Sequence, residues 1–151
     1  MKVLLAVLLA AAPAAPAFAQ DAKVGDLVIR NAVMRAVPPG VPNTAGYLTI
    51  VNSGAREDRL ESVSCACAKS VEPHLSHVMN GQAMMMPAGP VTVPARGQIR
   101  FSPGGYHLMV MGLKSPLKDG GHEDMVLKFQ HAGTVTVPFL AETRIETRSA
   151  D

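Results

Sequence analysis

Glycine and proline divide this chain into short stretches, which constrains its fold more than any other feature. The 151 residues include 13 glycines and 12 prolines. They cluster in turn signals at Pro38-Pro39-Gly40, Asn52-Ser53-Gly54, Pro103-Gly104-Gly105 and Asp119-Gly120-Gly121. The stretches between them are rich in valine, isoleucine, leucine and threonine, and none keeps a helical apolar period over three turns. We therefore predict an all-β single domain, either an antiparallel sandwich or a Greek-key barrel.

The strand-like stretches can be placed before any chemistry is considered. They are residues 26–38, 45–52, 58–75, 98–113 and 125–140, each long enough for one or two strands. The sequence has no internal repeat and no linker, so residues 20–151 are expected to build one core.

The first nineteen residues have the pattern of a secretory signal peptide. Lys2 precedes an apolar run from 3 to 12, two prolines interrupt the residues after this run, and Ala17-Phe18-Ala19 has the form that signal peptidase cleaves. The run is short for an uncleaved membrane anchor. We predict cleavage after Ala19 and export of residues 20–151, with the periplasm as the destination.

Charge excludes several classes of partner. Of the 14 lysines and arginines only Lys2 lies in the signal segment, which leaves 13 basic against 12 acidic residues, a net charge of +1. Like charges do not run together, and the chain has only two tyrosines and four phenylalanines. This balance predicts neither nucleic-acid binding nor attraction to an anionic membrane.

Histidine and methionine are concentrated in two stretches of the sequence. Residues 72–87, EPHLSHVMNGQAMMMP, hold two of the five histidines and four of the nine methionines. Strand alternation there separates Val71 and Leu75 from His74, which shares a face with Glu72 and Ser76.

The second stretch, residues 105–111, gives the same division. Alternation assigns Tyr106, Leu108 and Val110 to the core and His107, Met109 and Met111 to the other face. An imidazole and a thioether two residues apart on one face can reach the same ion.

This mixture of donors points to copper. Thioether sulfur suits Cu(I) and binds hard divalent ions poorly, while imidazole tolerates both oxidation states of copper, which leaves Cu(II) binding open. The clusters of cysteine and histidine that are typical of zinc sites do not occur.

The spacing of these residues resembles that of the PCuAC family of periplasmic copper chaperones. The family motif is His, ten residues, Met, twenty-one residues, His, one residue, Met, and His74, Met85, His107 and Met109 match it without a gap. The segment PGGYHLMVMGLKSPLKDG, 103–120, is also similar to the family.

The resemblance has implications for fold, site and partners. It implies a cupredoxin-like Greek-key fold and a metal site at the four motif residues. It implies delivery of Cu(I) to the dinuclear copper centre of cytochrome c oxidase, a haem-copper oxidase, alongside a thioredoxin-like copper protein. It also implies binding without catalysis.

Two other functions and several residues stay open. A cupredoxin-type electron carrier would need a thiolate near the second histidine, and a thiol oxidoreductase would use Cys65 and Cys67. Alternation places both cysteines on the same face of a strand, together with Val63. They could be buried thiols, copper ligands, or a local disulfide that requires a bend in the strand.

The remaining histidines are expected to be structural. His122 and His131 fit solvated turns, while His77 and Met79 fit loop or core roles, with a transient second site or an exchange ligand as the alternative. The sequence has no motif of a known catalytic site.

Overall fold

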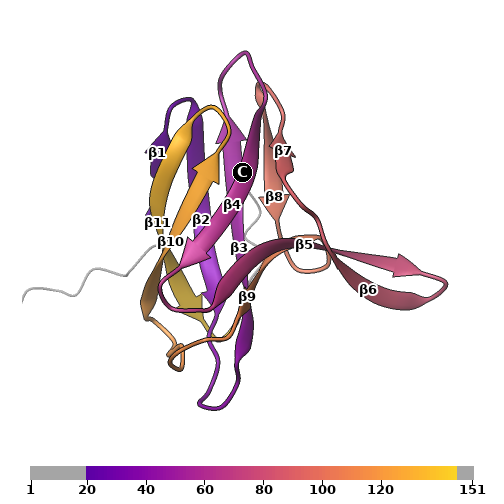
Figure 1. Ribbon diagram of the computed structural model, residues 1–151, viewed down its shortest axis with the longest axis vertical. Helices are drawn as coiled ribbons and strands as arrows, with labels where there is room; N and C mark the ends of the chain where they lie inside the picture. Colours follow the sequence, from indigo (N-terminus) through magenta and orange to yellow (C-terminus); the bar gives the residue numbers. More distant parts are fainter. Residues whose placement is uncertain (1–19, 146–151) are drawn as a thin grey trace, which may run out of the picture.

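The computed structural model describes residues 20–145, and every regular element in that range is a β-strand (Figure 1). The all-β prediction is therefore confirmed. The strands are β1 Ala22–Val24, β2 Leu27–Arg35, β3 Asn43–Asn52, β4 Asp58–Cys65, β5 Ser70–Met79, β6 Gln82–Pro87, β7 Val91–Val93, β8 Gly97–Phe101, β9 Tyr106–Met111, β10 His122–Phe129 and β11 Gly133–Glu142. Within this part of the chain no helix is long and apolar enough to cross a membrane. The predicted signal segment lies outside the described residues.

The strands form one sheet that closes on itself. Its order is β6-β5-β9-β8-β3-β2-β11-β10-β4-β7, with further pairings of β5 with β4 and of β9 with β3. The closing contact between β4 and β5 joins Val63 to Val71. Most pairs are antiparallel as predicted, but β2 and β11 run parallel, as do β8 and β9. β2 and β11 are far apart in the sequence, whereas β8 and β9 follow one another and pair only at Phe101 and Tyr106.

The core is made by the inward faces of these strands. The prediction that Leu108 and Val110 point inward is confirmed, since both are fully buried, and Tyr106 packs at the edge of the same cluster. The largest fully buried side chains are Phe101, Phe129, Phe139, Leu27, Ile29, Met34, Leu48, Ile50, Leu60, Leu108, Met125 and Leu127. Burial of each contributes about 1.5–3 kcal/mol, which makes the body a rigid support for side chains on its surface.

The β5–β6 hairpin projects from this body (Figure 1). β9 pairs with β5 from Ser70 to Leu75, and beyond that point residues 76–79 pair only with β6. A two-residue turn joins β5 to β6 and keeps the two strands closely paired. Asn80 and Gly81 both have positive φ, 52° and 77°. Two such residues form the type I′ turn that fits the twist of a two-residue hairpin.

Asp58 ties the start of β4 to the turn between β10 and β11. It is 6% exposed, and its carboxylate accepts hydrogen bonds from the backbone N–H groups of Arg59, His131 and Ala132 at 2.7, 3.0 and 2.8 Å. Burial by itself raises the pKa of Asp58, but these hydrogen bonds and the nearby His131 together hold it below its ordinary value.

Asp58→Ala should lower the free energy of unfolding by about 2–3 kcal/mol at pH 7, because three partly buried backbone N–H groups lose a charged acceptor. A carboxyl whose pKa is lowered on folding stabilises the protein above its ordinary pKa, about 3.9, and this contribution is lost as the pH falls below about 4. Urea unfolding at pH 7 and at pH 3 tests this. The difference between wild type and variant should shrink at pH 3, and the exposed Asp124→Ala should change little. Equal effects of both variants at pH 7 would contradict this role.

Candidate metal site

The sheet register places the four motif residues on one face of three neighbouring strands. Directly paired residues of adjacent strands point to the same side of a sheet, and so do residues two apart along a strand. Three pairs therefore share a face, namely Glu72 with Met109, His74 with His107, and Ser76 with Met85. The four motif residues, which lie between positions 74 and 109, thus project to the same side. We call the side that carries His74, Met85, His107 and Met109 the first face.

His74 lies at the centre of this set. Its ring centroid is 5.9 Å from that of His107, with the rings tilted by 55°. Met109 lies one diagonal step away on β9, and Met85 lies one diagonal step away on β6. Diagonal neighbours in a sheet have Cα atoms roughly 7–8 Å apart, which long side chains can span. Met85 and Met109 flank His74 on opposite sides, so His74 is the residue that both thioethers can approach.

The hydrogen bonding of His107 leaves one ring nitrogen available. Nδ1 lies 3.2 Å from the carbonyl oxygen of Gly105, and since a carbonyl only accepts, Nδ1 carries the proton. Nε2 is therefore the nitrogen with a free lone pair, and it is buried without a hydrogen-bond partner. A buried acceptor left unpaired costs free energy unless a ligand fills the position. This arrangement is the one that metal-binding histidines adopt, with the second nitrogen held by a carbonyl.

Glu72, which alternation placed on the same face as His74, is a neighbour of the candidate site. Its Oε2 atom lies 3.4 Å from Nε2 of His74, and its side chain is half exposed. Carboxylates beside metal-binding histidines commonly fix the ring orientation. The i, i+2 spacing of Glu72 and His74 on a strand could have indicated this contact.

The site is more enclosed than strand alternation suggests. We expected both histidines to face away from the core, yet His107 is 4% exposed and the His74 side chain 14%. Alternation identifies the face on which a side chain lies but not what covers that face. Met85 is different, because it is 64% exposed on the projecting hairpin. Three of the predicted ligands therefore lie on the body and the fourth on an exposed arm.

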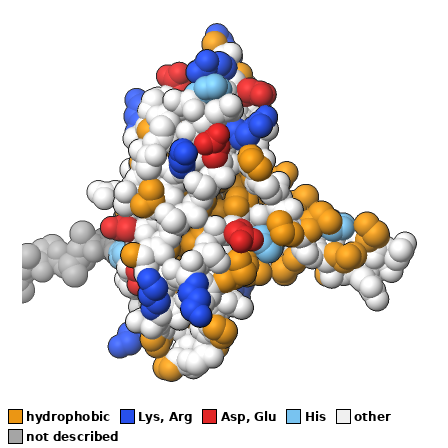
Figure 2. All heavy atoms as spheres, viewed as in Figure 1, with side chains coloured by type: hydrophobic (Ala, Val, Ile, Leu, Met, Phe, Trp, Pro, Cys, Tyr) orange, Lys and Arg blue, Asp and Glu red, His pale blue; other side chains and the backbone are white. Residues whose placement is uncertain are grey.

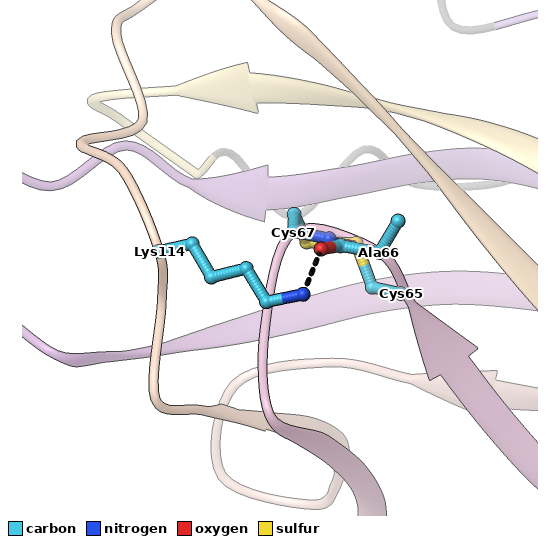
Figure 3. Close-up of a disulfide and its surroundings, with 4 residues drawn as sticks. All are labelled: Cys65, Ala66, Cys67 and Lys114. Atoms are coloured by element: carbon cyan, nitrogen blue, oxygen red, sulfur yellow. Dashed lines mark hydrogen bonds between the residues drawn. A yellow bond between two sulfur atoms is a disulfide. The ribbon is translucent and has the colours of Figure 1, made fainter.

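Cys65 and Cys67 form a disulfide, one of the three alternatives that the sequence left open (Figure 3). The expectation that both lie on one strand face is wrong, because β4 ends at Cys65 and Cys67 lies in the following turn. The turn brings their Cα atoms to 5.1 Å, within disulfide range. Nζ of Lys114 donates to the Ala66 carbonyl at 2.8 Å across this turn (Figure 3).

The disulfide lies beside the carboxylate of Glu123. The sulfur atoms of Cys65 and Cys67 and a carboxylate oxygen of Glu123 lie within 4.8 Å of one another. A disulfide offers no thiolate, so this group is not a soft-metal site in the oxidised protein. His122 and His131 are both exposed, at the start of β10 and in the turn after it, as expected.

Reducing the disulfide should weaken folding only slightly. The bridge closes a loop of sequence separation 2, for which chain entropy gives about 1.5 kcal/mol. The double variant Cys65→Ser, Cys67→Ser should therefore lose less than about 2 kcal/mol in urea unfolding, and its copper affinity should equal that of wild type. A loss of copper affinity in the double variant would mean that the cysteines contribute to the site.

The chain is similar to known proteins over most of its length. A family model described as "Putative lipoprotein LpqE-like" matches residues 27–140. A relative from Leifsonia xyli subsp. xyli, "Putative lipoprotein Lxx21020", is 31% identical over 113 residues, which are 73% of this chain and 67% of the relative.

Two solved copper-bound structures have a fold similar to that of this chain. The copper-bound PCuAC domain from PmoF2 is 26% identical with a TM-score of 0.72, over 83% of this chain and 99% of that domain. The Cu(I) form of DR1885 from Deinococcus radiodurans is 31% identical with a TM-score of 0.60, over 85% of each chain. The predicted cupredoxin-like fold is therefore confirmed, and its structural neighbours are PCuAC domains. With a match to the family model over residues 27–140, the chain belongs to the LpqE-like family.

Proposed function

We propose that this protein is a copper carrier that binds one Cu(I) ion through His74, Met85, His107 and Met109. The observation that carries the proposal is the unpartnered, buried Nε2 of His107, which lies beside His74 on the face that also holds both methionines. Two imidazoles and two thioethers are neutral donors, so the bound ion keeps its single charge, and soft sulfur favours Cu(I).

Met85 is the ligand through which copper would leave. The other three donors lie on strands of the body, whereas Met85 lies on an exposed arm and has three rotatable side-chain bonds. Loss of one thioether from this arm opens a coordination position without disturbing the histidines. A partner donor can then occupy that position, which is how a carrier releases an ion by ligand exchange.

The partner is proposed from the family resemblance and from the chemistry of the site. The protein would act after export, in the periplasm, as the signal-like residues 1–19 and the relative described as a lipoprotein suggest. The recipient would be the dinuclear copper centre of cytochrome c oxidase, whose thiolates outcompete neutral ligands for Cu(I). A thioredoxin-like copper protein would act alongside. The role is binding and transfer without catalysis.

The two competing functions have less support. A blue-copper electron carrier needs a cysteine thiolate on the metal, and both cysteines are joined in a disulfide. That disulfide is largely buried at Cys65, unlike the exposed cysteine of a thiol oxidoreductase.

The test is a Cu(I) titration against a competing chelator, followed by X-ray absorption and by mixing with the apo copper domain of an oxidase. We expect one ion per chain to be retained against the chelator, in a colourless complex with nitrogen and thioether neighbours, and we expect this ion to move to the oxidase domain. Scattering from thiolate sulfur alone would exclude the proposed ligands. Copper that stays on this chain in the mixture would exclude the carrier function.

A further inference from the structure

Two buried side-chain nitrogens in residues 20–145 lack a hydrogen-bond partner, and they lie on opposite sides of the hairpin. One is Nε2 of His107, on the first face. The other is Nδ1 of His77. Because His77 follows Ser76 in a regular strand, its side chain points away from the first face. The proposed copper site therefore explains one of these two nitrogens and leaves the other without a role.

The register places methionines around His77. Met84 is its direct partner on β6, and Met86 is the partner of Leu75 and hence a diagonal neighbour of His77. Met79 lies two residues along β5 on the same side. Directly paired side chains have Cβ atoms about 4.5–5.5 Å apart. We call the side with His77, Met79, Met84 and Met86 the second face.

These methionines are not explained by packing. Seven large hydrophobic side chains are exposed in the described residues, and five of them lie in this hairpin, at Val78, Met79, Met84, Met85 and Met86. Met84 and Met86 are 43% and 45% exposed. Figure 2 shows hydrophobic side chains gathered over the projecting hairpin, with histidine among them. Exposed apolar clusters of this kind mark binding sites, and because four of these five side chains are methionines, the cluster favours a ligand that prefers sulfur.

We propose that the second face is a separate binding site for one soft monovalent cation, Cu(I) in the cell, held by His77, Met84 and Met86. One imidazole and two thioethers satisfy the low coordination number that a soft d¹⁰ ion accepts, and Met79 supplies a third sulfur. The site has one histidine where the first face has two, and its sulfurs are exposed, so it binds more weakly. It goes beyond the proposed function, because its residues are distinct from the four on the first face.

Silver ion is the probe for the test, since Ag(I) is a soft monovalent ion that is stable in air. Protein with ¹³C-labelled methionine methyl groups is titrated with Ag(I) and followed by NMR, with each methyl assigned by a Met→Leu variant. We expect the first equivalent to shift Met85 and Met109, and the second to shift Met84 and Met86. His77→Asn should lower the stoichiometry from two ions to one and leave the first shifts intact.

Matched variants separate this proposal from the first one. Met84→Leu with Met86→Leu, nearly equal in volume, should also abolish the second binding event, while His74→Asn with His107→Asn should abolish only the first. Methyl groups of Met84 and Met86 that stay fixed up to several equivalents would overturn the second site. So would shifts that persist unchanged in His77→Asn, since these would indicate binding to isolated thioethers. Shifts at Met84 and Met86 without any at Met85 and Met109 would overturn the proposed function and support the second site.

Discussion

His107→Asn is expected to lower the Cu(I) affinity of this protein by about 100-fold or more. Loss of a residue that merely supports a metal ligand costs about 10–100-fold, so loss of the ligand itself should reach at least the upper end of that range. Asparagine is chosen because its side-chain amide can still donate to the Gly105 carbonyl, as Nδ1 of His107 does. The variant therefore removes Nε2 and keeps the contact that anchors the ring.

The measurement is a competition titration with a Cu(I) chelator of known affinity. His131→Asn is the matched control, because it makes the same chemical change at an exposed turn, away from the first face. Urea unfolding of both variants shows whether the fold is kept. An affinity that is unchanged in His107→Asn, or that falls equally in His131→Asn, would mean that the unpaired nitrogen of His107 is not a copper ligand.

The Gly105 carbonyl shows what the sequence could not predict. Besides facing Nδ1 of His107, it accepts a hydrogen bond from the backbone N–H of Ser76 at 3.1 Å. One oxygen thus orients a site histidine and fixes the base of the hairpin that carries Met85. Spacing along the chain singled out the histidine and the methionine as proposed ligands. It could not identify this contact, because the two segments meet only through the pairing of β5 with β9.

Local patterns predicted most strands correctly for a physical reason. A strand with one buried face repeats every two residues, so Leu108 and Val110 could be assigned to the core from sequence. The short strands β1 and β7 were not predicted, because three residues are too few to establish a period. The extent of burial at His107 was also missed, since it depends on strands far away in the sequence.

The choice among the three adjacent methionines of the hairpin also depends on the folded structure. The run Met84-Met85-Met86 is ambiguous by composition, since each residue is an equivalent donor. The motif spacing singled out Met85, and the register of the hairpin, set by the turn at Asn80 and Gly81, places it opposite Ser76 on the first face. A register shifted by one residue would turn Met85 to the second face. The assignment of Met85 as a ligand therefore depends on the turn that sets the hairpin register as much as on its thioether.

The double variant Met85→Leu, Met109→Leu is expected to change which oxidation state of copper the protein prefers. Each thioether stabilises Cu(I) more than Cu(II), and its loss should weaken Cu(I) binding about tenfold, or about 1.4 kcal/mol. The remaining imidazoles tolerate both states, and the nearby Glu72 carboxylate suits Cu(II). Cu(I) affinity should therefore fall about 100-fold while Cu(II) affinity changes little. With one electron transferred, each tenfold change corresponds to about 59 mV, so the reduction potential should fall by about 120 mV.

The matched control for this variant is Met84→Leu, Met86→Leu, which removes two thioethers from the same hairpin but from the second face. Leucine has nearly the volume of methionine, so both variants should keep the fold. Affinities for the first equivalent of Cu(I) and Cu(II), with potentiometry of the loaded protein, compare the two. The control should leave the potential of the first site unchanged, because neither of its methionines shares a face with His74 and His107. Equal falls in potential for both variants would mean that copper does not distinguish the two faces, and the ligands would then have to be sought across the whole Met84–Met86 run.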